Sequence, residues 1–250
     1  MATSIAVAGK GGTGKTTITA LIVRYLKEHK KGSVLVMDAD PDANLGTLLG
    51  IKPEKSLGDL REEILREIKK LPSGMSKAAY LEAGLHQIIA EADGFDLIAM
   101  GRGEGPGCYC YLNSLIRKFS EDLTPSYAWV VMDNEAGLEH LSRRTTNNID
   151  ALVVVVNENP LSFDTAKNIE SITANINNNI RRKCLVTNMV RPDKFPLVIE
   201  RSRGLHLDHI GDIPSDPILD EAIFQGRSIM DLRNSVAFES ISRIMKSVGG

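Results

Sequence analysis

Residues 9–16 read GKGGTGKT and fit the phosphate-binding pattern G-x-x-x-x-G-K-[ST]. The pattern lies between an apolar run, Ser4–Ala8, and a helical pattern, Lys15–His29, and this strand–loop–helix context is the one in which it cradles phosphate. Its four glycines let backbone N–H groups approach phosphate oxygens, because no Cβ obstructs them. The positive end of the helix dipole would face the same anion. This stretch therefore predicts a nucleoside triphosphate site.

The residues of this loop have distinct expected roles. Lys15 would reach the β- and γ-phosphates, the Thr16 hydroxyl would bind Mg²⁺, and Thr17 would hold the α-phosphate. Lys10 would face outward over the phosphates, where its ammonium group could neutralise a nucleotide held by a facing subunit. The alternative for Lys10 is a solvated lysine beside a negative ligand. The backbone cradle would be formed by Gly11, Gly12, Thr13 and Gly14.

Apolar runs and amphipathic stretches alternate along most of the chain. The apolar runs are short and rich in Val and Ile, as in strands covered on both faces: Ser4–Ala8, Ser33–Met37, Phe95–Met100, Ala128–Met132, Ala151–Val156 and Cys184–Thr187. Leu207–Gly211 predicts one more short strand near the end of the chain. The amphipathic stretches predict helices: Lys15–His29, Ser56–Lys70, Lys77–Ala92, Asn113–Ser120, Ser162–Asn175, Asp216–Phe224 and, roughly, Asp231–Val248. This alternation predicts an α/β fold with a mostly parallel central sheet and helices on both faces. We expect residues 1–250 to form a single P-loop domain.

The composition excludes several classes of protein. A net charge of −2 leaves no global basic footprint for nucleic acid. The longest aliphatic run, Ala151–Val156, is far shorter than the ~20 residues that span a bilayer. The N-terminus lacks the pattern of a secretory signal, and three cysteines cannot form a disulfide framework. We therefore expect a cytoplasmic protein that binds neither nucleic acid nor membrane.

Acidic residues follow two more of the predicted strands. Asp38 and Asp40 leave the second strand, and ligands of such sheets bind beyond the carboxyl ends of the strands. One carboxylate could orient the attacking water and another could hold a water of the Mg²⁺ shell. The alternative is a cluster of Asx turns that caps the next helix. Asp133 and Gly137 form D-x-x-x-G after a strand, which resembles a switch II whose Asp holds Mg²⁺ indirectly and whose Gly amide contacts the γ-phosphate.

Two cysteines, Cys108 and Cys110, stand close together in the sequence GPGCYC at residues 105–110. Held by Gly-Pro-Gly, their sulfurs could point at one ion, and thiolates suit nickel, Cu(I), zinc or iron–sulfur centres but not magnesium or calcium. Two thiolates leave a four-coordinate ion half filled, so a second chain on a two-fold axis would complete the site. The alternative is a pair of small buried side chains at the start of a helix.

Lys10 resembles the early lysine of the deviant Walker A class, which includes MinD, ParA, the arsenite pump ATPase and the nitrogenase iron protein. The resemblance implies that Lys10 crosses a dimer interface towards the partner's phosphates, that Asp40 orients the water and that Asp38 serves the metal shell. It also implies that Asn188 and the backbone after Pro214 read an adenine. The guanine-specific pattern N-K-x-D is absent at residues 188–191, which favours ATP and ADP.

Four segments together resemble the CooC-type ATPases: GKGGTGKTT, DADPDANLG, GPGCYC and DNEAGLEHLSRRT. Those accessory proteins load nickel into carbon monoxide dehydrogenase, and a close relative serves acetyl-CoA synthase. The resemblance implies a homodimer, formed on nucleotide or metal binding, with Ni²⁺ or Zn²⁺ at the paired cysteines and a nickel enzyme as client. It runs from residue 5 to about residue 188 and more loosely through Pro214, and residues 53–92 carry no motif that identifies the client.

Two other classes remain open. An electron donor like the nitrogenase iron protein would share an iron–sulfur cluster across the dimer, but that family has a cluster cysteine just past switch II, where residues 137–141 contain none. A MinD- or ParA-like positioning ATPase would bind membrane or DNA through the last helix. That helix carries an apolar stripe, which more often packs on the parent sheet: Val236, Phe238, Ile241, Ile244, Met245 and Val248.

Overall fold

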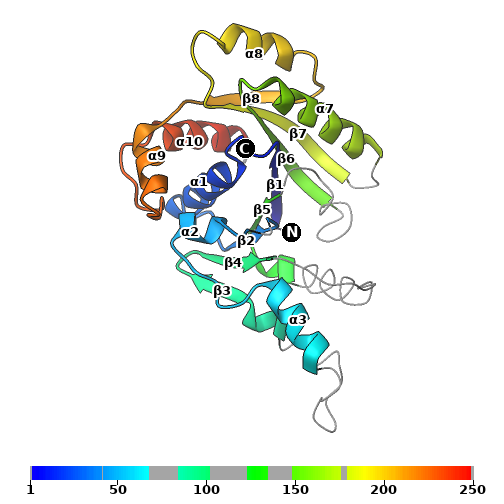
Figure 1. Cartoon of the computed structure of the whole chain (residues 1–250), viewed down its shortest axis with the longest axis vertical. Coiled ribbons are helices and arrows are strands. Elements are labelled where there is room, and N and C mark those ends of the chain that lie inside the picture. The colour runs from blue at the N-terminus through cyan, green and yellow to red at the C-terminus, as the bar shows by residue number, and fades with distance from the viewer. Residues whose placement is uncertain are drawn as a thin grey trace.

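The computed structural model describes residues 2–40, 42–67, 84–101, 123–134, 148–175 and 179–248. In this part of the chain, eight strands form one sheet in the order β3-β4-β2-β5-β1-β6-β7-β8 (Figure 1). The strands are β1 (Thr3–Gly9), β2 (Val34–Asp38), β3 (Ile89–Ala92), β4 (Phe95–Ala99), β5 (Trp129–Asp133), β6 (Asn148–Val156), β7 (Asn179–Asn188) and β8 (Asp208–Ile213). Every neighbouring pair is parallel except β3–β4, so the predicted mostly parallel sheet is confirmed.

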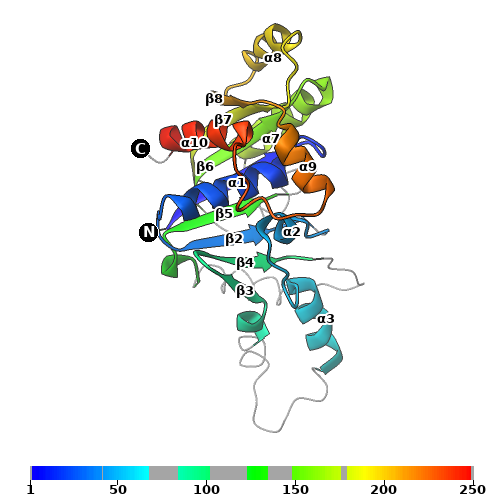
Figure 2. The same ribbon diagram turned by 90° about the vertical axis from the view of Figure 1, so that its left-hand side faces the viewer.

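Helices cover both faces of this sheet (Figures 1 and 2). One face is covered by α1 (Lys15–Glu28), α2 (Leu45–Leu49), α9 (Pro217–Phe224) and α10 (Val236–Val248). The other face is covered by α3 (Leu57–Glu67), α7 (Pro160–Asn175) and α8 (Phe195–Ser202). A short 3₁₀ turn, η1 (Thr124–Ser126), precedes β5. None of the helices in the described ranges is both long and apolar enough to cross a membrane.

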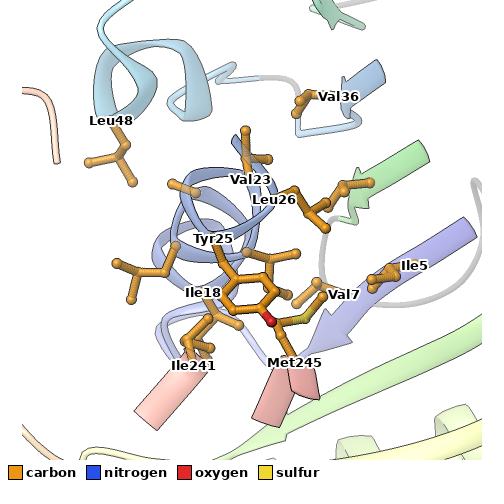
Figure 3. Packing of buried hydrophobic residues seen from close by; sticks show 14 of the residues in the cluster. Ile5, Val7, Ile18, Val23, Tyr25, Leu26, Val36, Leu48, Ile241 and Met245 are labelled. Atoms are coloured by element: carbon orange, nitrogen blue, oxygen red, sulfur yellow. The ribbon is translucent and has the colours of Figure 1, made fainter. Parts of the chain in front are cut away.

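The sheet separates two apolar clusters, and alternate residues of each central strand enter one or the other. In β1, Ile5 and Val7 face the cluster around α1, whereas Ala6 and Ala8 face the cluster around α7. Figure 3 shows side chains of α1 packed against Ile5 and Val7 and against α10. Burying an aliphatic side chain fully stabilises the folded state by roughly 1.5–3 kcal/mol. Because the central strands are buried on both faces, apolar residues are favoured at every position, which accounts for the unbroken apolar runs of the sequence.

The last helix lies against α1 and β8, and its stripe belongs to the core. Ile241, Ile244 and Met245 are buried, while Val236 at the start of the helix is 44% exposed. The packing interpretation of the stripe is therefore confirmed. The helix begins at Val236 instead of Asp231, because the Ser235 hydroxyl accepts a hydrogen bond from the Phe238 amide at 3.1 Å and caps this end.

The sequence prediction was wrong at one edge of the sheet. Residues 89–92 were assigned to the end of a helix, but they form β3, which pairs with β4 in an antiparallel hairpin. The turn is Asp93-Gly94, with Gly94 at φ 85°, and Asp-Gly between apolar runs is a hairpin signal that the helical periodicity concealed. The short helices α2 and α8 were not predicted, and the helix expected at residues 113–120 lies outside the described residues.

Candidate active site

The glycine-rich loop leaves the end of β1, which lies between β5 and β6 in the middle of the sheet. Gly12 and Gly14 adopt left-handed backbone conformations, with φ of 80° and 86°, that favour glycine. A Cβ built on Gly14 would lie 2.3 Å from Asn188 Nδ2, whereas one built on Gly11 or Gly12 would meet no atom of the described chain within 4 Å. The loop is thus closed against β7 at Gly14 and open at the two glycines expected to cradle phosphate.

Hydrogen bonds within the loop hold it in this shape. The Thr13 hydroxyl donates to Lys10 O at 2.8 Å, and the Lys15 ammonium donates to the same carbonyl at 3.3 Å. Asn188 Nδ2 donates to Thr13 O at 2.8 Å and so ties the loop to the end of β7. Lys15 is buried beneath the loop, while Lys10 at its start is half-buried.

The first turn of α1 points at the opening of the loop. Gly14 is the N-cap residue, and no side chain of the described chain caps the helix. The first turn contains no acidic residue, and it carries Thr16 and Thr17, which are half-buried. Backbone N–H groups at such a helix start, together with the helix dipole, favour an anion. The expected binding groups for phosphate are therefore assembled at one place.

Two buried carboxylates lie side by side next to this loop. Asp38 ends β2, Asp133 ends β5, and the two residues are paired in the ladder between these strands. Asp38 accepts hydrogen bonds from the amides of Asp40 and Leu45, both at 3.1 Å. The half-buried Asp40 accepts a hydrogen bond from the Asp42 amide at 2.9 Å. The carboxylates of Asp38 and Asp40 thus form the turns that the sequence predicts as their alternative role. Asp38 and Asp133 also lie at the carboxyl ends of their strands.

Burial changes the acidity of both carboxylates. It raises the pKa of Asp38 to about 7, and the charge of Asp133 adds to this effect. Burial also raises the pKa of Asp133 to about 6, although the Thr16 and Thr19 hydroxyls and the Lys15 ammonium lower it. A nearby cation would favour the charged form of both groups.

One oxygen of this pair fits a magnesium shell. Asp133 Oδ2 is buried and accepts no hydrogen bond of ordinary geometry from the described residues. A buried acceptor is rarely left without a partner, and Mg²⁺ prefers oxygen ligands and ordered water. The oxygen atoms around Asp133 therefore fit a Mg²⁺ ion that would accompany the nucleotide phosphates. The Thr16 hydroxyl would be the direct ligand of that ion.

Asn188 and Pro214 lie at the same edge of the sheet. Asn188 ends β7, Pro214 follows β8, and the Met189 amide donates to Ile213 O at 2.9 Å between them. The side chain of Asn188 is buried, whereas Pro214 is exposed. The bond from Asn188 to Thr13 gives this residue a loop-holding role that the sequence analysis did not assign.

Sequence reasoning missed two polar residues around Asp133. The Thr19 hydroxyl lies 3.2 Å from Asp133 Oδ1 and 3.0 Å from Lys15 O. Asn134 is buried and donates from its side-chain amide to Val7 O at 3.0 Å, which ties this residue to β1. The sequence feature that could have identified Thr19 is its hydroxyl group, which stands one helical turn after Lys15 in an otherwise apolar stretch.

Three of the expected site residues lie outside the described residues: Cys108, Cys110 and Gly137. Cys184 is fully buried in β7, so its expected place in the core is confirmed. Within the described ranges, no group of three or more His, Cys, Asp or Glu side chains is placed to hold a metal ion. The geometry of the described residues thus bears on the nucleotide site and not on the C-x-C motif.

Residues 4–229 match the family model of the CobQ/CobB/MinD/ParA nucleotide binding domain. The chain belongs to this family. The family is one of ATPases of the MinD/ParA class, and this protein is an ATPase of that class.

Two relatives within the family match nearly the whole chain. An uncharacterised ATP-binding protein of Methanocaldococcus jannaschii is 38% identical over 247 residues, which are 98% of this chain and 97% of that protein. The carbon monoxide dehydrogenase accessory protein CooC of Rhodospirillum rubrum is 31% identical over 240 residues, which are 91% of this chain and 89% of that protein.

Solved structures of the same class have the same fold. The septum site-determining protein MinD of Pyrococcus horikoshii, complexed with Mg-ADP, aligns with a TM-score of 0.65 and 18% identity over 99% of this chain and 96% of that one. At this identity the likeness supports the fold alone.

Proposed function

We propose that this ATPase is a cytoplasmic metallochaperone that binds Ni²⁺ at Cys108 and Cys110 of a homodimer and delivers it to carbon monoxide dehydrogenase or acetyl-CoA synthase. The observation that carries the proposal is the sequence GPGCYC in a chain that is 31% identical to CooC over 91% of its length. The four thiolates of two chains would complete a site for Ni²⁺ or Zn²⁺, which is cargo and not a resident cofactor.

Hydrolysis would be carried out by the residues around the glycine-rich loop. The backbone of residues 11–14 and the ammonium of Lys15 would hold the β- and γ-phosphates, and Asp40 would orient the attacking water. Asp38 and Asp133 would hold the water shell of Mg²⁺, which when bound neutralises charge on the phosphates. Lys10 of the partner subunit would add a second positive charge, so hydrolysis would depend on the dimer.

In this proposal, the neighbouring strand ends would connect the nucleotide site to the C-x-C motif. The Ala39 amide donates to Asp133 O at 2.9 Å, and the Met100 amide donates to Asp38 O at 2.8 Å. The end of β4 is therefore bonded to the end of β2, and β2 to β5. The segment that carries the cysteines follows directly after β4 and Gly101 in the sequence. A shift of these strand ends, or of the switch that contains Gly137, would alter the sulfur geometry and release the ion.

Delivery is tested by restoring a nickel-free client. Nickel-free carbon monoxide dehydrogenase is incubated with the nickel-loaded protein and ATP, and carbon monoxide oxidation is measured. We expect activation that exceeds the effect of the same amount of free nickel and that is lost in Lys15→Ala and in the double variant Cys108→Ser, Cys110→Ser. Cys184→Ala is the matched control, because it removes a buried core cysteine. Activation equal to that by free nickel would contradict the delivery role and leave the ATPase activity standing.

A MinD- or ParA-like positioning ATPase is the second candidate, and the match to the CobQ/CobB/MinD/ParA family model favours it. Its support in the sequence was the apolar stripe of α10, which is packed into the core. A membrane-binding protein would pellet with anionic liposomes when ATP is present, and a DNA-binding protein would shift a duplex at low salt. An electron donor of the iron protein kind would show the visible absorption of an iron–sulfur cluster after anaerobic purification.

A further inference from the structure

The Thr19 hydroxyl stands between the phosphate-binding helix and Asp133. Thr19 lies one turn after Lys15 on α1 and is completely buried. Its Oγ1 atom is 3.0 Å from Lys15 O and 3.2 Å from Asp133 Oδ1. A hydroxyl has one proton, so it donates fully to one of these acceptors at a time. An ionised carboxylate is the stronger acceptor, which favours the bond to Asp133 whenever that group is charged.

This bond constrains the carboxylate that the nucleotide site needs. Asp133 Oδ1 accepts a hydrogen bond from Thr19, and the Thr16 hydroxyl also lies close enough to lower the pKa of this carboxylate. Asp133 Oδ2 is buried and has no hydrogen-bond partner among the described residues. Fixing one oxygen of a planar carboxylate fixes the rotation of the group and hence the position of the other oxygen. The α1 helix that supplies the phosphate-binding N–H groups therefore also sets the orientation of the carboxylate at the end of β5.

We propose that Thr19 is a positioning residue for ATP hydrolysis, whose hydroxyl holds Asp133 so that Oδ2 stays available to the Mg²⁺ shell. The inference concerns the ATPase site alone and stands whichever cargo or client the protein serves. The competing explanation is purely structural, because buried Thr residues in helices often donate to the carbonyl one turn earlier. In α7, Thr173 makes such a bond to Glu170 O at 2.9 Å, far along the chain from the nucleotide site.

Thr19→Val and Thr19→Ser separate the two explanations. Valine keeps the branched shape and removes the hydroxyl, whereas serine keeps the hydroxyl. The affinity for ADP is measured with and without Mg²⁺ by calorimetry, together with kcat, KM and the free energy of unfolding. For Thr19→Val we expect the Mg²⁺-dependent gain in ADP affinity to fall about tenfold, as for one lost charge-assisted hydrogen bond, with the Mg²⁺-free affinity unchanged. Thr19→Ser should behave as the wild type does.

Two further variants test whether the effect of Thr19 depends on its place beside Asp133. Thr173→Val is the matched control, since it removes a buried helix hydroxyl elsewhere and should leave the Mg²⁺ effect intact. In an Asp133→Asn background, Thr19→Val should cause no additional loss, because the partner of the hydroxyl has lost its charge. A Thr19→Val protein with lowered stability but an unchanged Mg²⁺ effect would overturn the proposal. If that variant does not fold, Thr19→Ala serves in its place under the same criterion.

Discussion

Replacing Gly14 with alanine tests how the phosphate loop is held against the sheet. The left-handed backbone at this residue costs alanine ~1–2 kcal/mol. The new Cβ would lie 2.3 Å from Asn188 Nδ2, so the Asn188 side chain must move and give up its bond to Thr13 O. Leaving that carbonyl buried without a partner costs a further ~1–3 kcal/mol. We therefore expect Gly14→Ala to lose about 2–5 kcal/mol of stability and most of its ATP affinity.

Two glycines with similar backbone conformations supply the controls. Gly226 has φ 64° and an open Cβ position, so Gly226→Ala should lose only the backbone cost and keep ATP binding. Gly12 has φ 80° and is also open within the described chain, so Gly12→Ala should lose a similar amount of stability but block phosphate. The measurements are urea unfolding and ATP titration of each variant. A Gly14→Ala protein no less stable than Gly226→Ala would refute the reasoning about Asn188.

The remaining predictions concern catalysis, the dimer and pH. Lys15→Ala should lose ATP turnover and bind ATP weakly, whereas Asp40→Asn should bind ATP and lose turnover; equal losses of binding would contradict this division of roles. Lys10→Ala should bind ATP but dimerise poorly on ATP in size-exclusion runs, and an unchanged dimer would leave Lys10 as surface charge. Because burial raises the pKa of Asp38 to about 7, the nucleotide-free folded chain holds a proton there that the unfolded chain releases. Its stability should fall as the pH rises from about 4, the pKa of the unfolded chain, to about 7, the pKa of the folded chain, and urea unfolding should show a smaller fall in Asp38→Asn.

The sequence was informative where one local pattern decides the structure. The central strands are buried on both faces, so their apolar runs were visible without any tertiary contact. The glycine pattern placed the loop between a strand and a helix, and β1 and α1 have these positions. The edge strand β3 was missed because its residues are half-buried or exposed and continue an amphipathic pattern, so only the Asp-Gly turn indicated a hairpin.

The contacts that organise the site join residues far apart in the sequence. The bond from Asn188 to Thr13 spans 175 residues, and the bond from Thr19 to Asp133 spans 114. Nothing in the local pattern of either segment specifies such a pair, because the pairing depends on the order of the strands in the sheet. The same holds for Asp38 and Asp133, which are paired because β2 and β5 are adjacent in the sheet. Burial raises both pKa values, and the charge of Asp133 adds to the rise at Asp38.

Metal analysis of the anaerobically purified protein tests the central claim most directly. Nickel and zinc are counted per chain together with the oligomeric state, for the wild type, for the double variant Cys108→Ser, Cys110→Ser and for Cys184→Ala. We expect one Ni²⁺ or Zn²⁺ ion per dimer in the wild type and in Cys184→Ala, and none bound tightly in the double variant, which should still fold and bind nucleotide. One ion per monomer, or undiminished binding in the double variant, would contradict a metal site shared between two chains.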